Sequence, residues 1–310
     1  SLMTFLTSIF LGLARGSGTV FSIRFGQKDQ LGLKEGILAS FVLLSIVTAL
    51  LNTAVFMGLD WIIWILRTPA NLVAMMREYL SVIFIGLAGI FLFNFFTSLL
   101  RSLGNSVLPL LFLAVSAVLN IALDLWFVAG LNRGAAGAAE ATVISQYVSG
   151  IGIAVYTRIK YPELLRRDKK VRFRRSRVKE ITGFSALTCL QQSIMNLGIL
   201  MVQGLVNSFG TTIMAAFAAA VKIDAFAYLP VQDFGNAFSI FTAPNSGENQ
   251  TERIKKGIRA ALTASVALSL LVSFCVFVFA KPLMPLFINA GETAVIDEGV
   301  RHLPIQGAFY

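Results

Sequence analysis

The sequence predicts an all-α integral membrane protein: a polytopic bundle of eight helical spans plus the start of a ninth, built from two parallel six-helix repeats. Hydrophobic residues fill 56% of its 310 positions, and the mean hydropathy is +0.76. Only 14% of the residues are charged, whereas a soluble domain carries roughly 25%, so this chain cannot cover its surface in water. In addition, apolar stretches of the length that a membrane helix needs, about 20 residues, follow one another along the chain.

The expected spans cover residues 1–25, 37–66, 79–100, 106–130, 135–156, 181–210, 211–243 and 260–280, and a ninth begins after Asp297. The third and sixth carry no charge, whereas the seventh is the most polar. The first residue is Ser1 rather than Met and opens directly on an apolar run. We therefore expect the complete protein to extend beyond both ends. No signal peptide with a cleavage site is recognisable.

Basic residues indicate the orientation. Lys and Arg number 26 against 16 acidic residues, and the largest block lies between 158 and 179. If the first span ends in the cytoplasm, most of the basic residues fall in cytoplasmic loops, as the positive-inside rule requires. We therefore predict the inner (plasma) membrane, with a cytoplasmic basic linker over 161–180. The run from Arg172 to Arg177 lies between two spans, which favours contact with anionic lipid over nucleic-acid binding.

Short motifs indicate an internal repeat. Gly18 followed by Phe21-Ser22-Ile23 recurs as Gly235 followed by Phe238-Ser239-Ile240, and Lys34-Glu35-Gly36-Ile37 recurs as Lys255-Lys256-Gly257-Ile258. Six crossings separate the copies, so both copies point the same way. Transporter folds are often built from such repeats. We predict an N-terminal lobe over 1–160, the linker over 161–180 and a partial C-terminal lobe over 181–310, with a substrate cavity between the lobes.

No enzyme signature competes with this interpretation. The only histidine is His302, which excludes a histidine triad or a His-rich metal site, and no phosphate-binding glycine loop is present. Cys189 and Cys275 each lie inside an apolar stretch, so we expect no disulfide framework. We expect no cofactor.

Three segments carry a family resemblance: Leu100-Arg101-Ser102-Leu103-Gly104-Asn105 with Pro109, then 119–124 (LNIALD), then 134–146 (GAAGAAEATVISQ). In this order and spacing they resemble the MATE family of multidrug and toxic compound extrusion transporters. The second lobe agrees through Gly183-Phe184, Met214-Ala215-Ala216, Lys222-Ile223-Asp224, Pro230 and Asp233-Phe234-Gly235.

The resemblance maps the lobes onto family helices 2 to 6 and 7 to 9, with the chain ending at the start of helix 10. Helix 1, most of helix 10 and helices 11 and 12 would be missing. Family members export amphipathic, often cationic compounds by antiport with Na⁺ or H⁺. The resemblance thus implies membrane lipid and a small organic substrate as partners, and we expect a monomer.

A cation-coupling site is predicted at Asn120, Asp124 and Thr142. Asn120 and Asp124 are four residues apart and share one helix face. Asp124 lies six residues before Gly130 and Thr142 five after Gly137, so at 1.5 Å per residue both sit about 8–9 Å below the same surface. Their oxygens would suit a small cation such as Na⁺, or they could form a protonatable network. The alternative is a structural one, in which Asn120 and Asp124 form a hydrogen-bonded pair that locks two helices together.

The resemblance supports the same three residues, because many members place a cation site on an Asn and Asp of helix 5 and a Thr of helix 6. A further Asp on helix 1 has no counterpart in this chain. One branch carries a glutamate on helix 7, where this sequence reads Leu190-Gln191-Gln192-Ser193, and this departure favours coupling in the first lobe. The substrate cavity is assigned to Lys222, Asp224, Asp233, Gln191 and Gln192.

The sequence therefore predicts a secondary active efflux transporter for amphipathic, cationic compounds. Two alternatives stay open: a lipid-linked flippase of the same superfamily, and a non-transporting membrane receptor or scaffold. The roles of Arg15 and Glu140, both inside expected spans, are not assigned.

Overall fold

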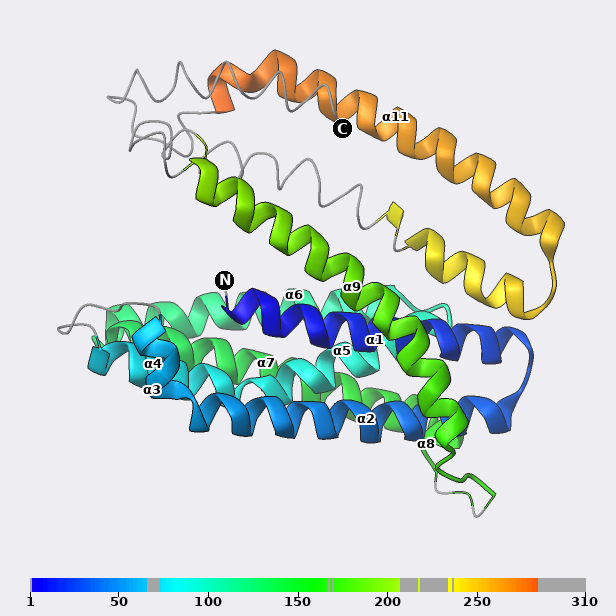
Figure 1. The fold of residues 1–310 in the computed structure, drawn as a ribbon, viewed down its shortest axis with the longest axis horizontal. Coiled ribbons are helices and arrows are strands. Elements are labelled where there is room, and N and C mark those ends of the chain that lie inside the picture. Colours follow the sequence, from blue (N-terminus) through cyan, green and yellow to red (C-terminus); the bar gives the residue numbers. More distant parts are fainter. Residues whose placement is uncertain are drawn as a thin grey trace. The chain divides into compact units, whose positions relative to one another are not determined.

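The computed structural model describes residues 2–65, 73–166, 168, 170–206, 217, 234–235 and 237–283. All regular elements in these ranges are helices (Figure 1), so the predicted all-α class is confirmed. The chain divides into two compact units, Ser1–Gln192 and Ser193–Tyr310. The boundary between the units falls inside one long helix, Arg175–Val206. The two units are described one after the other.

The first unit holds ten helical elements in the described ranges: α1 (Leu2–Gly26), α2 (Gln30–Met57), α3 (Leu59–Ile65), α4 (Val73–Ile85), α5 (Leu87–Ser102), α6 (Val107–Asp124), η2 (Leu125–Gly130), α7 (Gly134–Lys160), α8 (Pro162–Leu165) and the start of α9 (Arg175–Val206). The second unit holds the rest of α9 and α11 (Thr251–Leu283). Residues 237–247 are also helical.

Five helices in the described ranges are long and apolar enough to cross a membrane: Gln30–Met57, Val73–Ser102, Val107–Gly130, Gly134–Lys160 and Thr251–Cys275. The expected number of spans, eight and the start of a ninth, remains a prediction. The third expected span is interrupted, because α4 ends at Ile85 and α5 begins at Leu87. Beside this break, the hydroxyl of Tyr147 on α7 donates a hydrogen bond of 2.9 Å to the carbonyl oxygen of Ile85.

Helix α7 is the centre of the first unit, since it packs against α4, α5 and α6 (Figure 1). Two glycines allow its contact with α5. A Cβ on Gly150 would lie 2.7 Å from the carbonyl oxygen of Gly89, closer than any side chain can approach. Small residues at such crossings let the backbones come together, which is how membrane helices gain packing energy.

Helix α5 also packs against α1, and the core between these two helices is aromatic. Phe21 of α1 and Phe91, Phe95 and Phe96 of α5 are all buried, and Phe95 contacts both Phe21 and Phe96 edge-on, with ring centroids 6.1 Å and 5.1 Å away. Edge-to-face contacts of this kind are favourable beyond the area that they bury. This cluster fixes α1 and α2 against α5.

The turn between α5 and α6 explains part of the motif around residue 104. Gly104 has a φ of +86°, which favours glycine. Its N–H donates to the carbonyl of Arg101 at 3.0 Å, and the N–H of Asn105 donates to that of Leu100 at 2.9 Å. This is the Schellman arrangement that ends a helix. The Asn105 side chain then accepts from the N–H of Leu108 at 3.2 Å, so one turn ends α5 and begins α6.

Candidate functional site

The three residues predicted to couple a cation lie on two packed helices of the first unit. Asn120 and Asp124 are on α6 and Thr142 is on α7. The two helices are joined a turn further along by a hydrogen bond of 2.9 Å from the hydroxyl of Ser116 to the carbonyl oxygen of Ser145. The sequence analysis did not single out this serine pair, although Ser116 is four residues before Asn120 and therefore on the same face.

Asn120 and Thr142 contact each other. The amide nitrogen Nδ2 of Asn120 lies 3.4 Å from Oγ1 of Thr142, as donor to acceptor. The hydroxyl of Thr142 in turn donates to the carbonyl oxygen of Ala138 at 2.9 Å. Since this hydroxyl has only one hydrogen, its lone pairs are left to accept from Asn120 or to face a cation. Asn120 thus bonds to α7, and this contact also ties the two helices together.

Asp124 is half-buried, and its Oδ1 atom is buried without a hydrogen-bond donor among the described residues. An unsatisfied buried acceptor costs about 1–3 kcal/mol, and more when it is charged. This oxygen is therefore a candidate ligand for a cation. The backbone directly after Asp124 is a π-helix, Leu125–Gly130, which ends this span.

Glu140, two residues before Thr142 on α7, belongs to a different contact. Its Oε2 atom lies 2.5 Å from Nη1 of Arg133 in the loop before α7, and both side chains are partly exposed. This ion pair satisfies Glu140 outside the set formed by Asn120, Asp124 and Thr142. Arg15 lies on α1 and interacts with other groups.

The predicted substrate cavity is mostly outside the described residues. Lys222, Asp224 and Asp233 are all in that part of the chain. The two glutamines lie on α9, where Gln191 is exposed and Gln192 is buried. Within the described ranges, no three His, Cys, Asp or Glu side chains converge to hold a metal ion.

A close crossing of α1 and α9 was missed by the sequence analysis. A Cβ on Gly16 would lie 2.5 Å from the backbone nitrogen of Ser185 and 2.6 Å from its Cα, and one on Gly12 would lie 3.1 Å from the backbone nitrogen of Cys189. The hydroxyl of Ser185 also donates to the carbonyl oxygen of Leu13 at 3.4 Å. The signal was present, because both helices carry two small residues four positions apart.

A second missed feature is an ion-pair network that holds the start of α9 to α1 and α2; we call it the basic-end network. It consists of three arginines and three acids: Arg24, Asp29, Glu35, Arg174, Arg177 and Glu180. The sequence analysis used the arginines only to predict the orientation in the membrane. The acidic residues close to them in the sequence were the signal for ion pairing, and it was overlooked.

Distances within the basic-end network are short. Arg24 lies 2.7 Å from Glu180, and Arg177 lies 3.1 Å from Glu180 and 3.4 Å from Glu35. Nε of Arg174 is 2.9 Å from Oε1 of Glu35, but the geometry is not that of a hydrogen bond, so this contact is Coulombic. The network therefore joins segments about 140 residues apart in the sequence through charge-assisted contacts.

Comparisons with known proteins agree with this architecture. A family model described as MatE matches residues 1–126 and 186–310. Two relatives from Bacillus subtilis (strain 168), the probable multidrug resistance proteins YpnP and YoeA, are each 28% identical over 297 and 302 residues. The matches cover 94% of this chain in both cases, but 65% and 64% of the relatives. The chain thus spans just under two thirds of their length.

Solved structures show the same fold. One is described as the outward-facing conformation of a multidrug resistance MATE family transporter of the MOP superfamily. It superimposes with a TM-score of 0.91 at 21% sequence identity, over 99% of this chain and 69% of that one.

Proposed function

The chain belongs to the MATE family, and on that premise we propose that its protein is a secondary active efflux transporter that exports amphipathic, cationic organic compounds by antiport with Na⁺ or H⁺. Membership of a transporter family means that the chain is not an enzyme. The relatives named as probable multidrug resistance proteins support an efflux function. The observation that carries the coupling mechanism is the buried Oδ1 of Asp124, which no described residue supplies with a hydrogen bond.

Charge matching favours a monovalent ion. The site offers one carboxylate, one amide and one hydroxyl, and oxygen ligands of this kind suit hard cations. A single carboxylate in an apolar span is neutralised by one Na⁺ or one proton, whereas a divalent ion would leave an excess charge in the membrane, which is costly. We therefore propose that Asp124 carries the ion while Asn120 and Thr142 supply neutral oxygens.

Binding can drive transport only if the ion binds two conformations of the protein with different affinities. Asp124 is the last residue of α6, directly before the π-helix η2, so a change in its charge acts at the junction of two kinds of helix. We propose that neutralisation of Asp124 shifts this junction and, with it, the packing of α6 on α7.

We propose that the basic linker over 161–180 faces the cytoplasm and that the protein lies in the plasma membrane. The support is the basic segment between α7 and α9, where Arg172, Arg174 and Arg175 are exposed. An exposed basic loop is held on the cytoplasmic side by the positive-inside rule.

The test uses the full-length gene product in proteoliposomes with an imposed Na⁺ or proton gradient. Asp124→Asn should reduce gradient-driven export of a cationic dye by about 5- to 150-fold, the range of a coupling free energy of about 1–3 kcal/mol. Glu78→Gln, which removes an exposed carboxyl from α4, is the matched control. Export by Asp124→Asn at the wild-type rate, with unchanged ion dependence, would leave Asp124 a structural residue.

Thr142 offers a finer comparison at the same site. Thr142→Val keeps the shape and removes the hydroxyl, whereas Thr142→Ser keeps the hydroxyl. Only the valine variant should need a higher ion concentration for half-maximal export. Flipping of a lipid-linked substrate without dye export would instead favour the flippase, and neither activity would favour a receptor or scaffold.

A further inference from the structure

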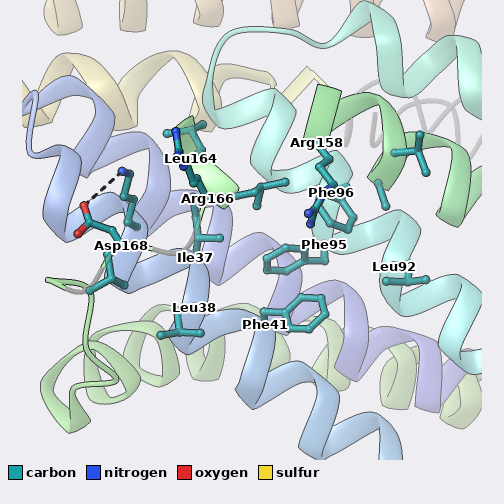
Figure 2. A pocket seen from close by; sticks show the side chains of 15 residues that line it. Ile37, Leu38, Phe41, Leu92, Phe95, Phe96, Arg158, Leu164, Arg166 and Asp168 are labelled. Atoms are coloured by element: carbon teal, nitrogen blue, oxygen red, sulfur yellow. Dashed lines mark ion pairs between the residues drawn. The ribbon is translucent and has the colours of Figure 1, made fainter. Parts of the chain in front are cut away.

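A pocket of about 820 Å³ opens in the first unit where α7 ends and α8 begins. Its lining comes from the start of α2, the middle of α5, the end of α7, α8 and the segment that follows α8 (Figure 2). This volume is within the range of sites for small organic molecules. None of its lining residues belongs to the proposed coupling site on α6 and α7.

The walls of the pocket are apolar and partly open. Leu38, Phe41 and Val155 line it with 37%, 38% and 49% of their surface exposed. The ring of Phe41 contacts those of Phe91 and Phe95, each with a ring centroid 5.3 Å away. Exposed apolar side chains at the end of a membrane-spanning bundle offer a surface for the acyl chain of a lipid, because lipids surround such helices in any bilayer.

Charge is concentrated at the rim. Three cations line the pocket, Lys34, Arg158 and Arg166, against one carboxylate, Asp168. Lys34 is paired with Asp168 at 3.8 Å. Arg158 and Arg166 are exposed, and neither forms an ion pair with any part of the chain that the structure describes. In Figure 2 Arg158 lies next to Phe96 and Arg166 lies next to Leu164.

We propose that this pocket binds one anionic phospholipid, with its headgroup at the rim that carries Arg158 and Arg166 and an acyl chain along Leu38, Phe41 and Val155. Guanidinium groups recognise phosphate oxygens through paired hydrogen bonds, and basic pockets between membrane helices bind anionic headgroups. The two free cations repel a cationic export substrate.

Lipid binding here has a consequence for the linker. The pocket joins α2 and α7 to α8 and to Val171, and residues 170–174 lead into α9. A bound lipid therefore holds the start of the linker against the first unit. The inference goes beyond efflux itself, and it rests on the proposed orientation only for which leaflet supplies the lipid.

The experiment is native mass spectrometry of the full-length gene product in mild detergent, titrated with phosphatidylglycerol or with phosphatidylcholine of the same acyl chains. Wild-type protein should retain phosphatidylglycerol and not phosphatidylcholine. The double variant Arg158→Gln/Arg166→Gln should bind it about 30-fold more weakly, since one basic residue near an anionic surface contributes roughly a fivefold factor. Val155→Trp, which narrows the pocket without changing charge, should also weaken retention.

The matched control is Arg101→Gln/Arg259→Gln. Both arginines are exposed, line no part of this pocket and form no ion pair within the described ranges, so this variant loses the same charge elsewhere and should bind as the wild type does. Equal weakening in both double variants would overturn the proposal, as would equal retention of both lipids. Displacement of the lipid by millimolar inorganic phosphate would show a simple anion site instead. Thermal melting without added lipid checks the fold of each variant, and none of these readouts depends on transport.

Discussion

Replacing Glu35 by Gln tests whether the basic-end network holds the start of α9 in place. The carboxylate of Glu35 is 2% exposed and lies between Arg174 at 2.9 Å and Arg177 at 3.4 Å. The substitution keeps the shape of the side chain and removes its charge. Arg177 retains Glu180 at 3.1 Å, so the expected effect is a weakened rather than an abolished attachment.

The magnitude follows from the exposure of the partners. Breaking a fully buried ion pair costs about 3–5 kcal/mol, whereas exposed pairs contribute about 0–1 kcal/mol. Glu35 lies between these limits, because the side chain of Arg174 is 57% exposed and that of Arg177 is half-buried, at 18%. We therefore expect a loss of about 2 kcal/mol, or roughly a 30-fold increase in the population with α9 detached.

Thiol labelling measures this population. Ala39 on α2 is fully buried in a small cluster with Val20 of α1 and Ile181 of α9, so a cysteine there reacts only when α9 moves away. On a background without the native cysteines, Ala39→Cys should react with a small maleimide about 30-fold faster in the Glu35→Gln variant.

Two comparisons make the labelling result decisive. Glu163→Gln removes an exposed carboxyl on nearby α8 and should leave the labelling rate unchanged. Glu35→Asp keeps the charge on a shorter side chain and should give an intermediate rate. If Glu35→Gln and Glu163→Gln label at the same rate, the network does not hold α9 and the argument from its geometry fails.

Two further predictions concern the helix crossing and the orientation. Gly16→Ala places a methyl group against the backbone of Ser185, which cannot move aside as a flexible side chain does. The melting temperature should therefore fall by more than it does for Gly183→Ala, since Gly183 has open space around it. Equal melting temperatures for the two variants would refute the close crossing. On a cysteine-free background, a membrane-impermeant thiol reagent should label Ser176→Cys only from the cytoplasmic side and Leu131→Cys only from outside. Labelling of Ser176→Cys in intact cells would reverse the proposed orientation.

Much of this protein was predictable because the bilayer acts on each helix separately. A span needs enough consecutive apolar residues whatever its neighbours are. The expected spans at 106–130 and 135–156 therefore agree closely with Val107–Gly130 and Gly134–Lys160. The motif from Leu100 to Asn105 is local in the same way, since its turn is closed by hydrogen bonds within a few residues.

The coupling site was predictable only in part. Helical spacing places Asn120 and Asp124 on one face, and counting residues from the turns places Thr142 at a matching depth. Neither argument says which atoms meet. The contact of 3.4 Å between Asn120 and Thr142 and the unpaired oxygen of Asp124 depend on how α6 and α7 are rotated about their axes, and the periodicity of one helix does not contain that rotation.

Tertiary structure alone decided the long-range contacts. Glu35 and Arg177 are 142 residues apart, and their sequence neighbours are compatible with many partners in a chain with 26 basic residues. Gly16 and Ser185 each sit in a pattern of small residues that does not name its partner helix. Amino-acid type and spacing decide which segments enter the membrane, because transfer from water is a property of each segment. Which helices then touch depends on close packing and on pairing of the few charges, which are properties of the assembled bundle.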